Sequence, residues 1–196
     1  MAPTCCTRKT PRFPRRTNPS TFILMTTYIA LLRAVNVGGT GKLAMSDLKS
    51  LCESGKFKNV RTYIASGNVL FESTRGEAAV QKTLEKLLYD HAGKSVDVIV
   101  RTGAEMAEVL ARNPFPREDP RRTVAIFLDA PPPKSTLESI TGCVDEVVRL
   151  GKREIYVCYG PNMGRSKLKI PAAKQGTARN MNTVATLASM AQDGVR

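Results

Sequence analysis

The alternation of hydrophobic and polar residues predicts that a strand and then a helix open the folded part of the chain. Residues 26–33, TTYIALLR, form an apolar run that is typical of a buried strand. After a glycine-rich stretch, apolar residues recur at helical spacing over 45–52. Ser46 is the predicted N-cap of this helix, and Gly55 is its predicted stop.

The following segment predicts a hairpin, a second helix and a further strand. The hairpin has strands at 60–64 and 69–71, and it turns at Ser66–Asn68. Helical spacing over 80–88 precedes the apolar strand pattern of 95–101. The resulting order, β-α-β-β-α-β, is that of a ferredoxin-like plait, an antiparallel sheet with helices on one face.

The rest of the chain partly repeats this order, so the predicted fold class is α+β with two ferredoxin-like plaits. The first plait covers residues 26–102, and a helix with a Pro-rich linker fills 103–121. The second plait, incomplete or decorated, covers 122–196. Its predicted elements are a strand at 123–129, a short helix with a Ser135–Glu138 capping box, a hairpin of 146–150 and 154–159, and a helix capped by Asn182 or Thr183.

The segment before this pattern, residues 1–25, is rich in Pro, Arg and Thr and poor in apolar residues. It cannot bury enough surface to offset its ordering entropy, which predicts disorder. A polyanion-binding basic arm and an Arg-rich targeting sequence are two interpretations. The third, which we favour, is that Met25 is the natural start, because regular periodicity begins abruptly at Thr26.

The charge of the chain changes this picture by suggesting a partner. The net charge is +13, of which the first 25 residues supply +5 with no acidic residue. The remaining +8 favours encounters with nucleic acid or phosphorylated molecules, although charge also serves solubility alone. No segment approaches the ~18 consecutive apolar residues that span a bilayer, so no membrane partner is predicted.

Cysteine and histidine indicate neither a metal site nor a disulfide framework. The five cysteines are odd in number and have no CxxC spacing, and His91 is the only histidine. We therefore predict no metal, no cofactor and a reduced, cytoplasmic location. A lone His on the apolar face of a helix is more often a packed or helix-end residue than a catalyst.

The glycine-rich stretch AVNVGGTGKL is similar to a phosphate-binding loop, but both familiar motifs fail in it. A Walker A motif would need Gly where Asn36 stands and Ser or Thr where Leu43 stands. A Rossmann fingerprint would fit Gly39, Gly41 and Ala44, but it also needs an acid after the next strand, which ends in IASG. Neither nucleotide motif is therefore predicted.

Two interpretations of that stretch remain open. One is a turn that uses glycine for positive φ. The other is a nest of backbone N–H groups at Gly38 and Gly39 that binds an anion, with Arg33 and Lys42 nearby.

The connection before the last helix is a second candidate for anion binding. No Asp or Glu occurs between residues 155 and 192. Arg guanidinium groups match phosphate and carboxylate geometry, and neutral amides and hydroxyls add hydrogen bonds. A solvated basic loop and a helix cap are the simpler interpretations. The residues concerned are Arg165, Ser166, Lys167, Arg179, Asn180 and Asn182.

Three segments, MTTYIALLRAVNVGGTGKL, NVRTYIASGNVLFES and GRSKL…GTARNMNTV, together resemble the bacterial family called domain of unknown function 1697 (DUF1697). The resemblance runs from Met25 almost to the C-terminus. It implies a pair of α/β plaits and brings no established activity, substrate or cofactor. The positions that carry the family pattern are Arg33, Asn36, Gly38, Gly39, Ser66, Gly67, Asn68, Arg165, Ser166, Lys167, Arg179, Asn180 and Asn182.

These polar loop positions lead to three hypotheses of function. The first is an anion-binding protein whose ligand is a nucleic-acid backbone or a phosphorylated small molecule. The second is a small-molecule enzyme that works without metal or His/Cys catalysis. The third is an interaction module that forms homo-oligomers through its sheet edges. Convergence of the three polar loops in one pocket would favour a single site.

Overall fold

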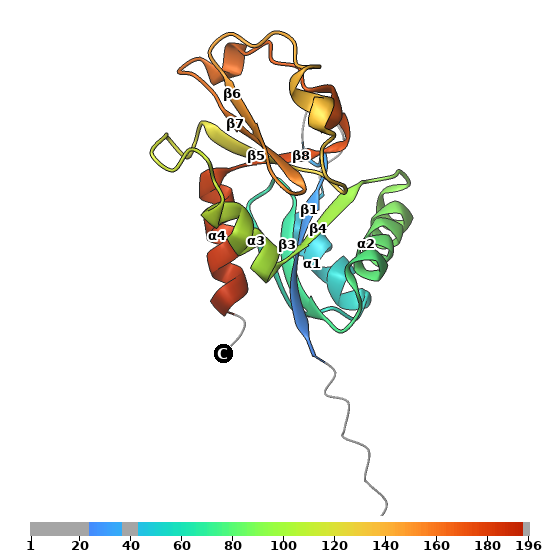
Figure 1. The fold of residues 1–196 in the computed structure, drawn as a ribbon. Coiled ribbons are helices and arrows are strands. Elements are labelled where there is room, and N and C mark those ends of the chain that lie inside the picture. Colours follow the sequence, from blue (N-terminus) through green and yellow to red (C-terminus); the bar gives the residue numbers. More distant parts are fainter. Residues whose placement is uncertain (1–23, 37–42, 194–196) are drawn as a thin grey trace, which may run out of the picture.

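The structure, a computed structural model, describes residues 24–36 and 43–193, which contain two four-stranded antiparallel sheets (Figure 1). The strand orders are β2-β3-β1-β4 and β6-β7-β5-β8. The strands of the first sheet are β1 (Thr26–Leu32), β2 (Lys58–Tyr63), β3 (Asn68–Ser73) and β4 (Val98–Thr102). Those of the second are β5 (Thr123–Phe127), β6 (Val147–Leu150), β7 (Glu154–Cys158) and β8 (Thr177–Asn180). The α+β class and the two plaits are thereby confirmed.

Helices α1 (Met45–Ser54) and α2 (Glu77–Ala92) belong to the first plait, as the hydrophobic spacing predicts. Gly55 ends α1, but the predicted N-cap is wrong, because Ala44 occupies that position and no side chain caps the helix. The apolar face of each helix packs on the sheet face that carries Tyr28, Ala30 and Leu32 of β1. Alternation along β1 then sends Ile29 and Leu31 to the opposite face.

That opposite face is covered by helices α3 (Gly103–Ala111) and α4 (Met181–Gln192), which come from later in the chain. Figure 1 shows α1 and α2 on one side of the first sheet and α3 and α4 on the other. The same core cluster includes Phe127 and Tyr156 of the second sheet. Both sheets therefore share one core around α3 and α4, and the division at 103–121 stays an interpretation.

The second plait replaces its two inner helices with 3₁₀ turns. These turns are η1 (Lys134–Leu137), η2 (Met163–Arg165) and η3 (Pro171–Gln175). The predicted Ser135–Glu138 capping box is wrong, because η1 is a 3₁₀ turn with Pro133 at the N-cap and no side-chain cap. The outer face of the second sheet packs on irregular chain, including Leu168 and Ile170.

The C-terminal segment differs from the prediction in two respects. Strand β8 was not predicted, because its four residues TARN have no apolar alternation. Helix α4 begins at Met181 with Asn180 as N-cap, so the predicted caps Asn182 and Thr183 already lie inside the helix. The Asn180 side chain accepts a hydrogen bond from the backbone N–H of Thr183 at 3.0 Å.

The strand pairing reveals an internal repeat that sequence identity does not show. Leu31 pairs with Asn68 as Phe127 pairs with Glu154, and Tyr28 pairs with Thr102 as Val124 pairs with Asn180. The equivalences also hold beyond the strands. The Leu32 N–H donates to Gly67 O at 2.8 Å, and the Leu128 N–H donates to Arg153 O at 2.9 Å. The two halves therefore share one β-β-β-β-α frame in matching register.

Candidate functional site

Arg179, in β8, joins the second plait to the first. Its side chain is buried with 8% of its surface exposed, and its Nε donates to Asn68 Oδ1 at 2.6 Å. Its Nη2 donates to Leu32 O and Ser66 O, each at 3.0 Å. Burial lowers the pKa of Arg179 to about 10, so the group is still a cation at neutral pH. Among the described residues its partners are neutral oxygens, which makes it a structural cross-link with its donors in use.

The hairpin turn that receives Arg179 is itself held by side-chain amides. Asn68 Nδ2 donates to Tyr63 O and to Ser66 Oγ, each at 3.0 Å. Between them Gly67 has φ +77°, and a Cβ there would overlap the Val35 side chain. Glycine is required at this position by both conformation and space.

Asn36 closes the chain around the glycine-rich stretch. Its Nδ2 donates to Leu43 O at 3.0 Å, and its Oδ1 accepts from the Leu43 N–H at 2.8 Å. The same Nδ2 lies 2.8 Å from Ala65 O, which ties this clasp to the hairpin. The predicted nest residues Gly38, Gly39 and Lys42 lie outside the described residues.

The remaining predicted residues lie apart from this network. The Ser166 hydroxyl hydrogen-bonds Glu146, and the Ser166 and Val144 donors lower the pKa of the Glu146 carboxyl. Arg165 and Lys167 are exposed, and Lys167 lies directly against Gly142. Asn182 is exposed on α4. Thus Asn36 and Arg179 both meet the hairpin turn at residues 65–68, whereas Arg165–Lys167 packs on the 142–146 loop.

Beside this network lies a cavity of about 510 Å³ between the end of β1, the end of α2 and the start of β4. The Arg33 and Asp97 side chains stand on its wall, 34% and 59% exposed, and Arg33 Nη1 lies 2.6 Å from Asp97 Oδ2. The Arg33 N–H also donates to Asp97 O at 3.0 Å, which fixes the two residues across neighbouring strands. His91, in the last turn of α2, and Lys94 add further polar lining.

The same cavity has apolar lining. Val35, Leu43, Leu88 and Val96 contribute to it, and all four belong to the core of the first plait or pack against it. A volume of this size lies within the about 300–1,000 Å³ typical of small-molecule sites, which combine apolar walls with a few polar groups. The arrangement can therefore hold a small molecule that has an apolar body and a charged end.

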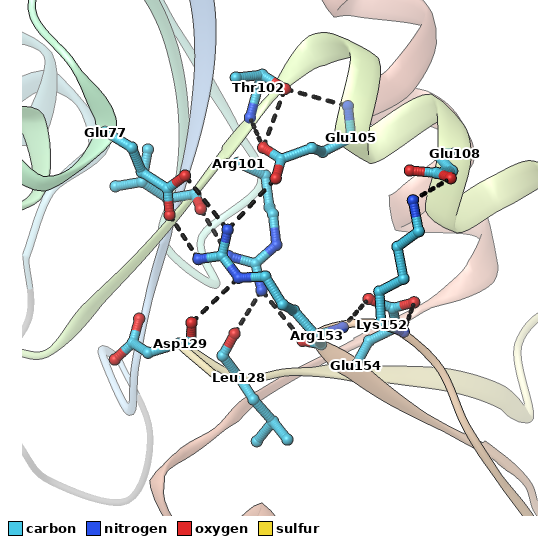
Figure 2. Close-up of polar contacts among 11 residues, drawn as sticks. Glu77, Arg101, Thr102, Glu105, Glu108, Leu128, Asp129, Lys152, Arg153 and Glu154 are labelled. Atoms are coloured by element: carbon cyan, nitrogen blue, oxygen red, sulfur yellow. Dashed lines mark hydrogen bonds and ion pairs between the residues drawn. The ribbon is translucent and has the colours of Figure 1, made fainter. Parts of the chain in front are cut away.

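A second polar cluster, around Arg101 and Arg153, also joins the two halves (Figure 2). Arg101, in β4, is 1% exposed and donates through Nη2 to the carbonyl groups of Leu128 and Arg153, the latter at 3.1 Å. Burial lowers the pKa of Arg101, and the neighbouring Arg153 cation lowers it further. In the internal repeat Arg101 is the equivalent of Arg179, because each is the fourth-strand residue before a helix N-cap.

Carboxylates balance the two adjacent guanidinium groups of this cluster. Arg153 Nη2 lies 2.5 Å from Glu77 Oε1, and Arg153 Nη1 lies 3.3 Å from Glu105 Oε1. The hydrogen bond to Glu77 raises the pKa of Arg153. Figure 2 shows Arg153 between Glu77 and Glu105, with Arg101 beside it. The cluster therefore links α2, α3 and the β6–β7 turn through the ion pairs of Arg153 with Glu77 and Glu105.

Sequence reasoning missed Arg101, Asp97 and the cavity. One signal was present, because VRTGAEM at 100–106 and ARNMNTV at 178–184 each place Arg before a capping residue and a helix. Thr102 forms a capping box with Glu105, as Asn180 caps α4. The Arg33–Asp97 pair spans 64 residues, and nothing in the local pattern indicates it.

Within residues 24–36 and 43–193, no three His, Cys, Asp or Glu side chains gather as metal ligands would. In the same residues, no helix has both the length and the apolar character needed to cross a membrane.

The fold and register define an α+β protein of two ferredoxin-like plaits that share one core. The family model "Protein of unknown function (DUF1697)" matches residues 25–156, and the chain belongs to this family. The match ends within β7, so the Arg165–Asn182 positions lie beyond it.

The chain is also similar to a solved structure, that of the conserved bacterial protein SP0830 from Streptococcus pneumoniae. The two are 26% identical with a TM-score of 0.72, over 86% of this chain and 99% of the other. No curated protein matches the chain.

Proposed function

We propose that this protein binds a small molecule that carries an anionic group, phosphate or carboxylate, in the cavity beside Arg33. The proposal rests on the position and hydrogen bonding of the Arg33 side chain. Its guanidinium stands on the wall of a cavity with apolar lining and is bonded through Nη1 to Asp97. A guanidinium has five N–H donors in a planar fork, and among residues 24–36 and 43–193 Nε and Nη2 of Arg33 have no acceptor, so these two nitrogens can receive an anion.

The charge of the lining supports an anion over a cation. Arg33 and Lys94 are cationic, and Asp97 is the acid among the residues that line the cavity. The concave, partly apolar shape favours a small molecule over a nucleic-acid backbone, which is held mainly by exposed cations along a groove. Arg179, with its donors already in use, is left out of this proposal, and so are the distant Arg165 and Lys167.

The proposal is tested by binding of two probes that both carry a phenyl ring and an acidic group, phenyl phosphate and 3-phenylpropionate. We expect chemical-shift changes in amide spectra at residues 33–35, 43 and 94–97, with saturation. Arg33→Gln should weaken binding about tenfold or more, since a charge-assisted hydrogen bond contributes roughly 1.5–3 kcal/mol. Arg165→Gln, an exposed cation elsewhere, is the matched control and should leave binding unchanged.

A single-stranded oligonucleotide tested beside these probes addresses the nucleic-acid version. If oligonucleotide binding falls steeply between about 50 and 200 mM salt and is unchanged in Arg33→Gln, nucleic acid is favoured as the ligand. Failure of both small probes to bind, or equal binding by wild type and Arg33→Gln, would overturn the proposal. Catalysis at this cavity stays a separate hypothesis.

A further inference from the structure

We infer that the molecule taken by the Arg33 cavity is a small amphipathic zwitterion, with an acidic group and an ammonium group on neighbouring atoms. This inference rests on the proposed function and narrows it. Its basis is that the cavity wall presents a cation and an acid side by side. A ligand with an acidic group alone would meet attraction from Arg33 and repulsion from Asp97.

The Arg33–Asp97 pair is held in place by the fold. Arg33 follows the last residue of β1 and Asp97 precedes the first residue of β4, two strands that pair directly. The backbone hydrogen bond from Arg33 N–H to Asp97 O, at 3.0 Å, adds a further rung to this ladder. Two charged side chains of opposite sign therefore stand on the wall of the cavity in a fixed relation, which lowers the ordering cost of binding.

The contact between Arg33 and Asp97 uses only part of the hydrogen-bonding capacity of the two side chains. One nitrogen of Arg33 meets one oxygen of Asp97, at 2.6 Å. Within the described residues, Asp97 Oδ1 has no hydrogen-bond donor, and Arg33 Nε and Nη2 have no acceptor. Nη2 shares its carbon with the bonded Nη1, and Oδ1 shares its carbon with the bonded Oδ2, so a carboxylate at Arg33 would place a neighbouring ammonium near Asp97 Oδ1. Such a ligand satisfies both charges without separating the pair.

The apolar lining sets the rest of the ligand. Leu43, Leu88 and Val96 line the same cavity, so the zwitterionic end should be joined to an apolar body of about one ring or a branched chain. Burial of that body supplies affinity, and the two charges supply orientation. An α-amino acid with an apolar side chain is the simplest molecule with these properties.

Three probes with one apolar body and different head groups test the inference by calorimetry at low salt. They are L-phenylalanine, which has both charges, 3-phenylpropionate, which has only the acid, and phenethylamine, which has only the amine. We expect L-phenylalanine to bind about tenfold more tightly than 3-phenylpropionate, the effect of one added charge-assisted hydrogen bond. Phenethylamine should bind most weakly.

Two variants separate the contributions of the pair. Asp97→Asn should remove the preference for L-phenylalanine and strengthen binding of 3-phenylpropionate, because the repelling charge is gone. Arg33→Gln should weaken both acidic probes. Each substitution removes an exposed ion pair worth at most about 1 kcal/mol, so the variants remain folded. Glu138→Gln, an exposed acid distant in sequence, is the control.

Each outcome decides one proposal or both. If 3-phenylpropionate binds as tightly as L-phenylalanine, or if Asp97→Asn keeps the preference, the zwitterion inference fails while the anion site stands. If neither acidic probe binds but phenyl phosphate does, the inference fails alone; if phenyl phosphate also fails to bind, the proposed function fails with it. If phenethylamine binds most tightly, the cavity is a cation site and both are overturned.

Discussion

Replacement of Arg179 by Lys should destabilise the whole protein, although it keeps the positive charge. The guanidinium reaches acceptors in three directions: Asn68 Oδ1 through Nε, Leu32 O and Ser66 O through Nη2, and Thr177 Oγ1 through Nη1 at 2.8 Å. The single ammonium nitrogen of lysine cannot reach all of these acceptors, which arginine reaches with three nitrogens. At least two buried acceptors then lose their donor.

The size of the effect follows from these contacts. A buried polar group left without a partner costs about 1–3 kcal/mol, so two or more give roughly 3–5 kcal/mol. This agrees with the about 3–5 kcal/mol lost when one member of a buried charged network is removed. Because natural domains are stable by only about 5–15 kcal/mol, the variant should be marginal.

Urea denaturation at neutral pH, followed by circular dichroism, measures the loss in free energy of unfolding. In a separate thermal melt, the melting temperature should fall by roughly 6–20 °C, at about 2–4 °C per kcal/mol for a chain of this size. Arg165→Lys, at an exposed position, should change stability by less than about 0.5 kcal/mol. A loss below about 1 kcal/mol in Arg179→Lys would refute the view that this side chain is a structural cross-link.

Three further predictions concern other parts of the molecule. Arg101→Lys should lower the free energy of unfolding by a similar amount to Arg179→Lys, since the Arg101 guanidinium also bridges the halves through buried carbonyl groups. If only one of the two substitutions destabilised the protein, the structural equivalence of Arg101 and Arg179 would be contradicted. Cys52 should resist iodoacetamide in the native protein because burial raises its thiol pKa to about 12, whereas the exposed Cys143 should react; peptide mass spectrometry after labelling compares them. The hydrogen bond from the Arg121 side chain lowers the pKa of Asp119 to about 2, below its unfolded value of about 3.9, so its stabilising contribution is present above that value and is lost as pH falls toward 2. The difference in unfolding free energy between wild type and Asp119→Asn should therefore shrink in acid, and a difference that stayed constant from pH 7 to pH 2 would be inconsistent with this shift.

The strands and helices with strong hydrophobic periodicity were predictable from the sequence. The order of β1, α1, β2, β3, α2 and β4 follows from residues 26–102 alone, because apolar residues recur in this segment at strand or helix spacing. Strand β8 was not predictable in this way. Its residues Thr177 and Arg179 are buried and polar, and they are stabilised by partners more than 100 residues away.

The candidate site shows the same division. Polar residues such as Asn68 and Arg179 could be picked out from the sequence, although both lie in strands and not in the predicted loops, and whether they face a ligand or the protein itself depends on distant contacts. In the structure they face each other. The Arg33–Asp97 pair depends on the pairing of β1 with β4, and Asp97 has no local pattern that distinguishes it from a solvated acid.

Arg101 of the first half bonds to the second half, and Arg179 of the second half bonds to the first. This mutual dependence has a consequence for the order in which the protein can fold during synthesis. Helix α4, the last helix of the chain, covers the inner face of a sheet whose strands are among the first to be synthesised. Until residues 181–192 have left the ribosome, the apolar side chains Ile29, Leu31 and Leu70 lack that cover, and the carbonyl of Leu32 lacks Arg179. Until then the nascent first plait should expose apolar surface, which is the condition that favours aggregation of folding intermediates. Once complete, the chain should unfold as one cooperative unit instead of one plait at a time.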